Sequence, residues 1–217
     1  MEVKMKNIIL IGAGGHASVI IDIIQSMIEN NHEIKIKGIL DDRKDIRKFM
    51  GYEILDEIKN AQLYNDKDTE FVIAIGNNAI RRNIEKKLNG IKYFTAIHST
   101  AVIGTNITIK SGTIVMPRVV INANTEIGSN VIINSGAIVE HDNTIDDFAH
   151  ISPGVTLCGG VTVGEATHIG ANSTVIQYKK IGSNSIIGAG STVITDIQSD
   201  VMAVGSPAKV IKYMKEV

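Results

Sequence analysis

The sequence is poor in several residue types, and each shortage narrows what the protein can be. It has no tryptophan, 4% aromatic residues and a single cysteine, Cys158. One cysteine cannot form an internal disulfide, which excludes a disulfide-stapled secreted scaffold and fits a reducing cytosol. Lys and Arg number 22 and Asp and Glu 23, so there is no basic footprint for nucleic acid. The apolar start, residues 8–24, is interrupted by glycines, His16 and Asp22. We therefore expect neither a signal peptide nor membrane insertion, and a cytoplasmic location.

A six-residue repeat runs through the second half of the sequence. One position in every six is aliphatic, sixteen times in succession: Ile103, Ile109, Val115, Ile121, Ile127, Ile133, Val139, Ile145, Ile151, Leu157, Val163, Ile169, Val175, Ile181, Ile187 and Val193. An unbroken hexapeptide period is typical of a parallel β-helix and excludes an α-helix. Three hexapeptides make one triangular coil, so residues 18 apart should stack, in about five coils.

The corners of this β-helix can also be predicted. Three residues after the aliphatic position come residues that tolerate positive φ, as a sharp corner requires: Asn106, Gly112, Asn124, Asn130, Gly136, Gly154, Gly160, Asn172, Asn184 and Gly190. Past the last repeat, Pro207 ends the extended structure, and residues 208–215 are predicted to form a short capping helix.

The first 95 residues lack this period. Strands are predicted at 7–11, 34–40, 71–75 and 91–94, helices at 18–29 and 79–88, and a polar, helical stretch between the second and third strands. This order predicts a parallel sheet with helices on its faces. The predicted domains are therefore residues 1–95, a small Rossmann-like α/β domain, and residues 96–217, a β-helix domain with a C-terminal cap.

The predicted α/β domain contains half of a dinucleotide fingerprint. Gly12, Gly14 and Ala17 lie between a predicted strand and a predicted helix, where glycines let the backbone approach a phosphate. Asp41 and Asp42 end the second strand and could bind ribose hydroxyls. No second mononucleotide half follows, which favours one sugar-linked nucleotide over NAD. The alternative is a tight turn beside a solvated Asp pair.

His141 is the candidate general base. An amine or hydroxyl that attacks a thioester must lose a proton, and a histidine with a pKa near neutrality suits that task. His141 lies at a predicted corner, and Gly159 and Gly160 stack over residues 141 and 142. The missing side chains are expected to leave room for a pantetheine arm, and the Gly159 amide could stabilise an oxyanion. The alternative is a solvated corner residue.

Two further questions stay open at the level of residues. Neighbours in a strand face opposite sides, so the carboxylate that orients His141 could be Glu140 or another such as Asp142. His150 and His168, 18 residues apart, should stack on one outward face, where they could meet a partner, coenzyme A or a metal. Zinc needs three or four ligands in tight geometry, so we expect no metal.

Motifs over the whole chain resemble the nucleotide-amino-sugar and sialic-acid acetyltransferases of the left-handed β-helix superfamily, especially those acting on UDP-4-amino sugars. The matching segments are residues 12–16, 40–42, 74–78 with Arg81, 116–117, 119–123, Asn134, 140–141, His150 and 204–209. Ala17 and Ala189 stand where relatives often have glycine, and residues 177–180 lack the usual corner proline and asparagine.

The resemblance implies that residues 1–95 bind a nucleotide sugar and that residues 96–217 are an acetyltransferase domain. It also implies an acetyl-CoA-dependent homotrimer with coenzyme A between neighbouring β-helices. It implies His141 as general base, Glu140 and Asn134 in support, and His150 facing the thioester from the adjoining wall. The implied acetyl-CoA contacts are His150, Gly159, Ala171, Ala189, Gly205, Pro207 and Lys209. The implied acceptor contacts are Gly12, Gly14, Gly15, His16, Asp41, Asp42, Gly76, Asn77, Asn78 and Arg81.

The predicted function is therefore N-acetylation of a nucleotide-linked amino sugar, a UDP-4-amino-4,6-dideoxy sugar above all. One alternative keeps the enzyme class and changes the acceptor, to O-acetylation of a sialic acid or another sugar. The other is a non-catalytic trimer that binds a nucleotide or a metal. Glu140 and His141 favour the enzyme.

Overall fold

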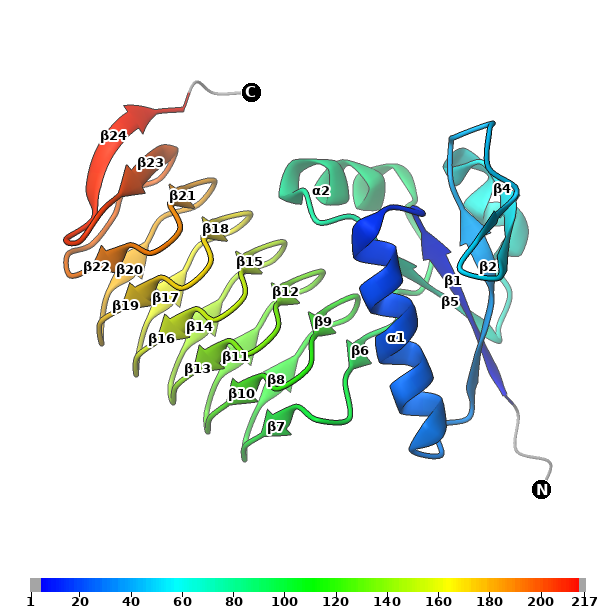
Figure 1. Ribbon diagram of the computed structural model, residues 1–217, viewed down its shortest axis with the longest axis horizontal. Helices are drawn as coiled ribbons and strands as arrows, with labels where there is room; N and C mark the ends of the chain where they lie inside the picture. The colour runs from blue at the N-terminus through cyan, green and yellow to red at the C-terminus, as the bar shows by residue number, and fades with distance from the viewer. Residues whose placement is uncertain (1–4, 215–217) are drawn as a thin grey trace. The chain divides into compact units, whose positions relative to one another are not determined.

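The computed structural model describes residues 5–214. Its contacts divide the chain into two compact units, Met1–Ser99 and Thr100–Val217. The first is an α/β unit and the second a coil of short stacked strands (Figure 1). No helix in the described range is long and apolar enough to cross a bilayer.

The α/β unit is built on one mainly parallel sheet in the order β3-β4-β2-β1-β5. Its strands are β1 (Lys6–Ile11), β2 (Ile34–Leu40), β3 (Lys48–Phe49), β4 (Tyr52–Asp56) and β5 (Thr69–Ile73). β1 pairs in parallel with β2 and β5, so it is central and buried on both faces, which explains its continuous apolar run. The helices are α1 (Gly15–Glu29), α2 (Asn78–Lys87) and the 3₁₀ helix η1 (Ile58–Tyr64).

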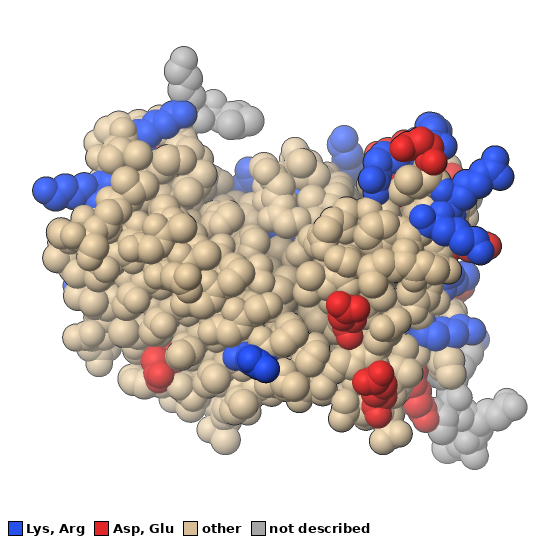
Figure 2. Space-filling view, viewed as in Figure 1, with Lys and Arg blue, Asp and Glu red and all other residues tan. Residues whose placement is uncertain are grey.

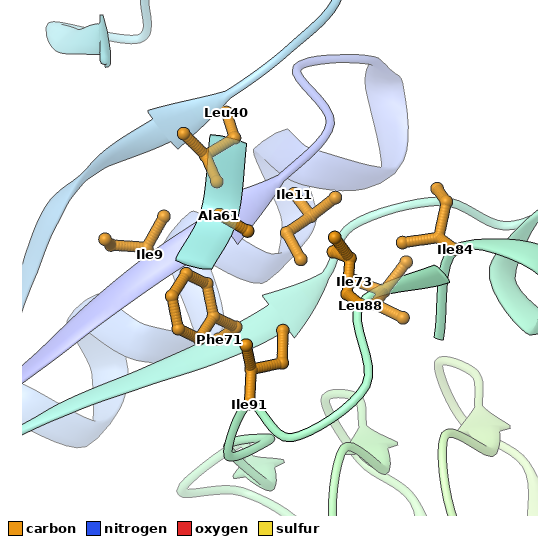
Figure 3. Close-up of a cluster of buried hydrophobic side chains, with 9 residues drawn as sticks. All are labelled: Ile9, Ile11, Leu40, Ala61, Phe71, Ile73, Ile84, Leu88 and Ile91. Carbon is orange, nitrogen blue, oxygen red and sulfur yellow. The ribbon is translucent and has the colours of Figure 1, made fainter. Parts of the chain in front are cut away.

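One hydrophobic cluster joins the sheet to η1 and α2. Its buried members come from β1, β2, β5, the two helices and the segment that follows them (Figure 3): Ile9, Ile11, Leu40, Ala61, Phe71, Ile73, Ile84, Leu88 and Ile91. Alternation along the strands turns Ile8, Leu10 and Ile39 to the other face, and α1 lies against β2 with six buried residues. The carboxyl ends of β1, β2 and β5 are thereby fixed relative to one another.

Two expectations for this unit were wrong. The segment between β2 and β5, predicted to be helical, contains the antiparallel hairpin β3–β4 and then η1. Met50 and Gly51, which join β3 to β4, both have positive φ, 47° and 85°. Such a turn fits a two-residue hairpin, but methionine in place of Asn or Asp hides the usual sequence signal. Residues 91–94, predicted as a strand, contribute one isolated bridge, Phe71 to Tyr93, and the next strand is β6 (Ala96–Ile97).

The second unit is a triangular parallel β-helix whose two-residue strands repeat on three faces (Figure 1). Face 1 comprises β7 (Val102–Ile103), β10 (Val120–Ile121), β13 (Ile138–Val139), β16 (Thr156–Leu157), β19 (Thr174–Val175) and β22 (Thr192–Val193). Face 2 comprises β8 (Thr108–Ile109), β11 (Glu126–Ile127), β14 (Thr144–Ile145), β17 (Thr162–Val163) and β20 (Lys180–Ile181). Face 3 comprises β9 (Ile114–Val115), β12 (Ile132–Ile133), β15 (His150–Ile151), β18 (His168–Ile169), β21 (Ile186–Ile187), β23 (Val201–Val204) and β24 (Lys209–Tyr213).

The predicted register is confirmed. Residues 18 apart pair in parallel from coil to coil, as Val120 does with Ile138 and Ile132 with His150. The aliphatic residues that recur every six positions form a column that points inward. Its fourteen members from Val115 to Val193 are each at most 1% exposed. Burying such a side chain is worth about 1.5–3 kcal/mol, so the column supplies the main stabilisation of each coil.

The residue three positions after each column residue, from Asn106 to Gly190, has positive φ. The ten Asn and Gly positions predicted for corners are among them. The other five corners carry Arg118, Asp142, Phe148, Ala166 and Tyr178. The coil geometry therefore imposes the left-handed conformation even on side chains that disfavour it.

The predicted C-terminal helix is absent from the described residues. β24 instead pairs antiparallel with β23 and extends face 3. Three of its five residues, Val210, Ile211 and Tyr213, are of β-branched or aromatic types that favour strands. The last coil offers an open sheet edge with which β24 pairs. Lys215, the end of the predicted helix, lies outside the described residues.

Candidate active site

His141 lies on the corner, residues 140–143, that joins β13 of face 1 to β14 of face 2. The next residue, Asp142, takes the left-handed corner conformation with φ 59°. Their side chains are 55% and 56% exposed, so the corner projects both into solvent. A substrate could therefore reach the imidazole without any rearrangement of the coil.

Asp142 holds one nitrogen of this imidazole. His141 Nδ1 lies 2.7 Å from Asp142 Oδ2, and Asn124 Nδ2 donates to Asp142 Oδ1 at 3.0 Å. Hydrogen bonds from His141 and Asn124 hold the pKa of the Asp142 carboxyl below its usual value. A carboxylate can only accept, so in the neutral ring the proton is on Nδ1 and Nε2 keeps a lone pair. This is the arrangement that a general base requires.

Glu140 points to a different partner. Its Oε2 accepts a hydrogen bond from Asn122 Nδ2 at 2.8 Å, one coil below. Of the two carboxylates beside His141, Asp142 is the one that contacts the ring, and Glu140 tethers the corner to the preceding coil.

Asn143 also fixes this corner, and sequence reasoning missed it. It is 1% exposed, at an inward position held elsewhere by small or β-branched residues. Its Nδ2 donates to the Glu140 carbonyl at 2.5 Å and to the Cys158 carbonyl at 3.2 Å, and its Oδ1 accepts from the Val161 amide at 3.1 Å. An asparagine in an inward series made mostly of small or β-branched residues was the available signal.

Two side-chain rings fill the space beside the glycines that stack over this corner. A Cβ on Gly159 would lie 2.6 Å from His141 Cε1, and one on Gly160 would lie 2.6 Å from Tyr178 Cδ1. Gly159 is buried, because the imidazole leans over it. The expected open space for a pantetheine arm between His141 and Gly159 is therefore filled by the imidazole. The Gly159 amide has no acceptor among residues 5–214.

Asn134 lies on the corner that leads from face 3 to face 1, and it contacts His150, which lies in β15 of face 3. Asn134 Nδ2 lies 3.1 Å from His150 Nε2, which is 8% exposed. One coil on, Ser152 Oγ lies 2.8 Å from His168 Nε2, and the two imidazoles stack with centroids 4.7 Å apart. The predicted histidine stack is thus present. This corner is not the His141 corner.

Further coils continue the Asn134 corner. Ala171 is half-buried there, and Ala189 and Gly205 follow it as exposed residues. Pro207 and Lys209, beyond the last coil, are exposed as well. The residues predicted to contact acetyl-CoA, Gly159 apart, therefore line one side of the β-helix, from Asn134 upward.

In the α/β unit, the glycine loop joins β1 to α1. Gly12 has φ 102°, and a Cβ there would meet Ile75 Cγ1 at 2.9 Å, so both its conformation and its packing require glycine. Gly14 and Gly15, at the N-terminus of α1, have open space beside them. A ligand could therefore approach the first amides of α1 closely.

Asp41 supports this loop. Its Oδ2 accepts from the Ala13 amide at 2.7 Å, and its Oδ1 accepts from Arg43 Nε at 2.9 Å. Burial acts to raise the pKa of Asp41, but the hydrogen bonds from Arg43 and Ala13 outweigh it and lower that pKa. Asp42 is exposed, and one of its oxygens accepts from the Ile58 amide at 2.9 Å.

The turn after β5 is held in a similar way. Asn77 caps α2 by accepting from the Ile80 amide at 3.0 Å. Arg81 is fully buried and donates to the carbonyls of Ile75 and Gly76, each at 3.2 Å, and to Asn78 Oδ1 at 3.0 Å. Burial lowers the pKa of Arg81 to about 9, which leaves it charged at neutral pH.

A cavity of about 310 Å³ lies between these two turns. It is lined by Gly12, Ala13, Gly14, Gly15, His16, Asp41, Arg43, Ala74, Ile75 and Gly76. Burial, and then the charge of Arg81, lower the pKa of His16 to about 4, so its ring is neutral at pH 7. A cavity of about 620 Å³ shares Asp41 and Arg43 and has Lys44, Arg47 and Lys48 on its wall. Figure 2 shows Lys and Arg side chains gathered near β4.

No group of three or more His, Cys, Asp or Glu side chains in the described part of the chain could hold a metal ion. The predicted functional side chains are gathered at three places, which are the His141 corner, the Asn134–His150 corner and the glycine-loop cavity.

Comparison with known proteins places this architecture. Residues 7–88 match the family model of the PglD N-terminal domain. UDP-N-acetylbacillosamine N-acetyltransferase of Bacillus subtilis (strain 168) is 36% identical over 122 residues, which is 52% of this chain and 52% of that protein. The chain thus covers 20% and 52% of the lengths of two curated relatives that it matches.

Two solved structures match nearly the whole chain. The acetyltransferase domain of PglB from Neisseria gonorrhoeae FA1090, in complex with acetyl coenzyme A, has a TM-score of 0.88 at 31% identity, over 95% of this chain and 100% of that one. PerB from Caulobacter crescentus, in complex with CoA and GDP-perosamine, has a TM-score of 0.84 at 32% identity, over 95% and 97%.

An α/β unit followed by hexapeptide coils defines a β-helical acyltransferase. Within that class, the chain belongs to the sugar N-acetyltransferase family. The predicted family and the predicted fold class, an α/β domain followed by a left-handed parallel β-helix, are confirmed, apart from the C-terminal helix.

Proposed function

We propose that this protein transfers the acetyl group of acetyl-CoA to the amino group of a nucleotide-linked amino sugar, specifically a UDP-4-amino-4,6-dideoxy sugar. The His141–Asp142 pair carries the proposal, because it leaves an imidazole nitrogen with a lone pair on an exposed corner. The relatives support the reaction class: one is named for N-acetylation of a UDP-linked sugar, and another binds CoA together with GDP-perosamine.

The proposed reaction is direct attack without an acyl-enzyme. The sugar amine attacks the thioester carbonyl carbon and forms the C–N bond, and His141 Nε2 accepts the proton that nitrogen loses. The Gly159 amide donates to the oxyanion of the tetrahedral intermediate. The intermediate collapses with cleavage of the C–S bond, and the imidazolium returns its proton to the departing CoA thiolate.

The acyl donor is assigned to the other corner. His150, held by Asn134, faces the thioester, and Ala171, Ala189, Gly205, Pro207 and Lys209 follow the rest of coenzyme A. His141 lies at the opposite edge of face 1 from these residues. We therefore propose that each complete site combines the His141 corner of one copy with the Asn134–His150 corner of the next, as in a homotrimer.

The acceptor nucleotide is assigned to the α/β unit. Gly12, Gly14 and Gly15 present the loop and the first amides of α1 to its phosphates, and the exposed Asp42 meets the ribose. Asp41, Arg81 and Asn77 keep the two turns in shape, since their polar atoms are engaged within the protein. His16, Gly76 and Asn78 complete the surroundings of the sugar-phosphate.

An acceptor panel tests the proposed function. CoA thiol release from acetyl-CoA is followed with a UDP-4-amino-4,6-dideoxy sugar, its GDP-linked counterpart and a free sialic acid. We expect turnover with the UDP-linked amine. Turnover with the GDP-linked amine alone would mean that the acceptor carries GDP instead of UDP. Turnover with sialic acid alone would favour O-acetylation. Acetyl-CoA binding without release for any acceptor would leave a binding protein.

The shared site has its own test. Neither His141→Ala nor His150→Ala should turn over appreciably alone, but refolded mixtures should recover activity, because some interfaces pair the intact His141 of one copy with the intact His150 of the other. The control is a mixture of His141→Ala with Asp142→Ala, which lie on one corner and should not complement. Equal activity of the two mixtures would contradict a site shared between copies.

A further inference from the structure

The His141 corner carries a ladder of side chains at its left-handed positions. Asn106 Nδ2 donates to Asn124 Oδ1 at 2.9 Å, and Asn124 Nδ2 donates to Asp142 Oδ1 at 3.0 Å. The next position of this stack is Gly160, which has no side chain, so the ladder ends directly above the His141–Asp142 pair.

Tyr178, one coil higher in the same stack, fills this gap. Its ring reaches down so far that a Cβ on Gly160 would lie 2.6 Å from Cδ1 and 2.9 Å from Cε1. The neighbouring Gly159 accommodates the His141 ring from below in the same manner. Two consecutive glycines thus receive an imidazole from one side and a phenol from the other.

The fold itself gains little from a tyrosine here. Tyr178 has φ 59°, a conformation that suits Asn or Gly and that a bulky side chain disfavours. The residue is 70% exposed, so burial offsets little of this strain. The coil imposes this conformation, and residues held in it against their preference cluster at active sites and ligand contacts.

We propose that Tyr178 is a specificity-determining residue that stacks on the hexose ring of the acceptor. The inference rests on the proposed function, which requires the sugar amine to come within hydrogen-bond distance of His141 Nε2. His141 covers Gly159 and Tyr178 covers the adjacent Gly160, so the two rings are neighbours on this corner. Because Tyr178 is 70% exposed, a rigid sugar at the imidazole can extend across the outward face of the phenol. A 4,6-dideoxy sugar has an apolar face and a methyl group at C6, which suit an aromatic surface.

The test replaces Tyr178 with two residues that differ in whether they keep the aromatic ring and in how well they tolerate positive φ. Tyr178→Asn removes the ring and restores a residue suited to positive φ, and Tyr178→Phe keeps the ring. Arg118→Asn is the matched control, since Arg118 also has φ 59° but lies on the corner from face 3 to face 1. Steady-state constants are measured with acetyl-CoA and the nucleotide-linked amino sugar that the wild type accepts, together with the Tm of each variant.

We expect Tyr178→Asn to raise the KM for the sugar about 5- to 10-fold, with the KM for acetyl-CoA within about twofold of wild type. Tyr178→Phe and Arg118→Asn should keep wild-type constants. Both asparagine variants should keep or raise Tm, by about 2–4 °C for each kcal/mol of relieved strain. An unchanged KM for the sugar, or a rise confined to acetyl-CoA, would overturn the role of Tyr178. A wild type that acetylates no nucleotide-linked amino sugar would instead defeat the proposed function.

Discussion

The two units differ in how their motif residues are used. In the α/β unit, Asp41 and Arg81 are 9% and 0% exposed, and their polar atoms bind backbone groups of the two turns. In the β-helix, His141 and Asp142 are more than half exposed, and His141 keeps one nitrogen for a substrate. The motifs of the first unit therefore act mainly as framework, with the backbone amides left to hold a ligand, whereas the corner of the second presents reactive side chains directly.

The difference follows from the architecture of each unit. The glycine loop and the turn after β5 are irregular segments that need side chains to fix them. Asp41 holds the first and Arg81 the second. A β-helix corner is fixed by its own coil, through column residues and backbone pairing and, at the His141 corner, through Glu140 and Asn143. The His141 side chain is therefore not needed to hold the corner in shape. Replacements in the two units should therefore separate loss of activity from loss of stability.

The largest expected effect is on the exposed side of this comparison. His141→Ala should lower acetyl transfer about 10²–10⁴-fold, the usual contribution of a positioned base, with no measurable change in Tm. CoA thiol release and thermal unfolding measure the two quantities. His32→Ala, an exposed histidine of the α/β unit, is the control and should change neither. Parallel loss of activity and Tm would contradict the view that the corner stands without its side chains.

His16, the half-buried histidine of the α/β unit, should instead affect stability and its dependence on pH. His16 has a folded-state pKa of about 4, against 6.5 for an ordinary histidine. Between these values the unfolded chain binds more protons, so stability present above pH 6.5 is lost as the pH falls toward 4, by up to about 3 kcal/mol.

Urea unfolding at pH 7 and pH 4.5 measures this loss for the wild type and for His16→Gln. The variant should lose less stability than the wild type over that interval, since its side chain does not titrate. His32→Gln should follow the wild type. Identical losses in all three proteins would show that His16 is not kept neutral by the fold.

Asn143 sharpens the comparison from within the β-helix, because it is a buried polar residue that holds an exposed corner. Asn143→Ala leaves the carbonyls of Glu140 and Cys158 and the amide of Val161 without this partner, and should cost about 2–3 kcal/mol of unfolding free energy. Ser173→Ala removes two inward hydrogen bonds on another corner, one donated to the Gly188 carbonyl and a longer one accepted from the Ser191 amide, and should cost about 1–2 kcal/mol.

Activity separates the two variants further, because only Asn143 fixes the His141 corner. Asn143→Ala should lower kcat at temperatures well below its Tm, whereas Ser173→Ala should not. Equal kcat values in both variants would leave Asn143 with a purely structural role.

The sequence predicted the β-helix almost to the residue, since a period of six fixes which side chains point inward and where the corners fall. It predicted positive φ at Asn124 and Gly160 from their residue types, while the period alone accounts for Arg118 and Tyr178. Side-chain rotamers are not set by a period. The spacing of 18 therefore placed Gly159 over His141, but not the imidazole that fills the space.

Prediction was less complete in the α/β unit because its contacts are irregular. The strand, glycine loop and helix at its start have local signals. The hairpin β3–β4 does not, since Met50 conceals its turn. The role of Asp41 depends on an amide 28 residues away, at Ala13, which no local pattern reveals. Its position after the second strand suggested a ribose contact, whereas its oxygens are engaged by the loop.

The smallest expected effect decides between the two carboxylates beside His141. Asp142→Asn keeps a residue suited to positive φ but offers the imidazole an uncharged partner, so kcat should fall about tenfold as the proton is less firmly held on Nδ1. Glu140→Gln can still accept from Asn122 and should keep kcat within about twofold. A larger loss in Glu140→Gln than in Asp142→Asn would mean that the corner rearranges when substrate binds, and that its exposed side chains are less fixed than the coil beneath them.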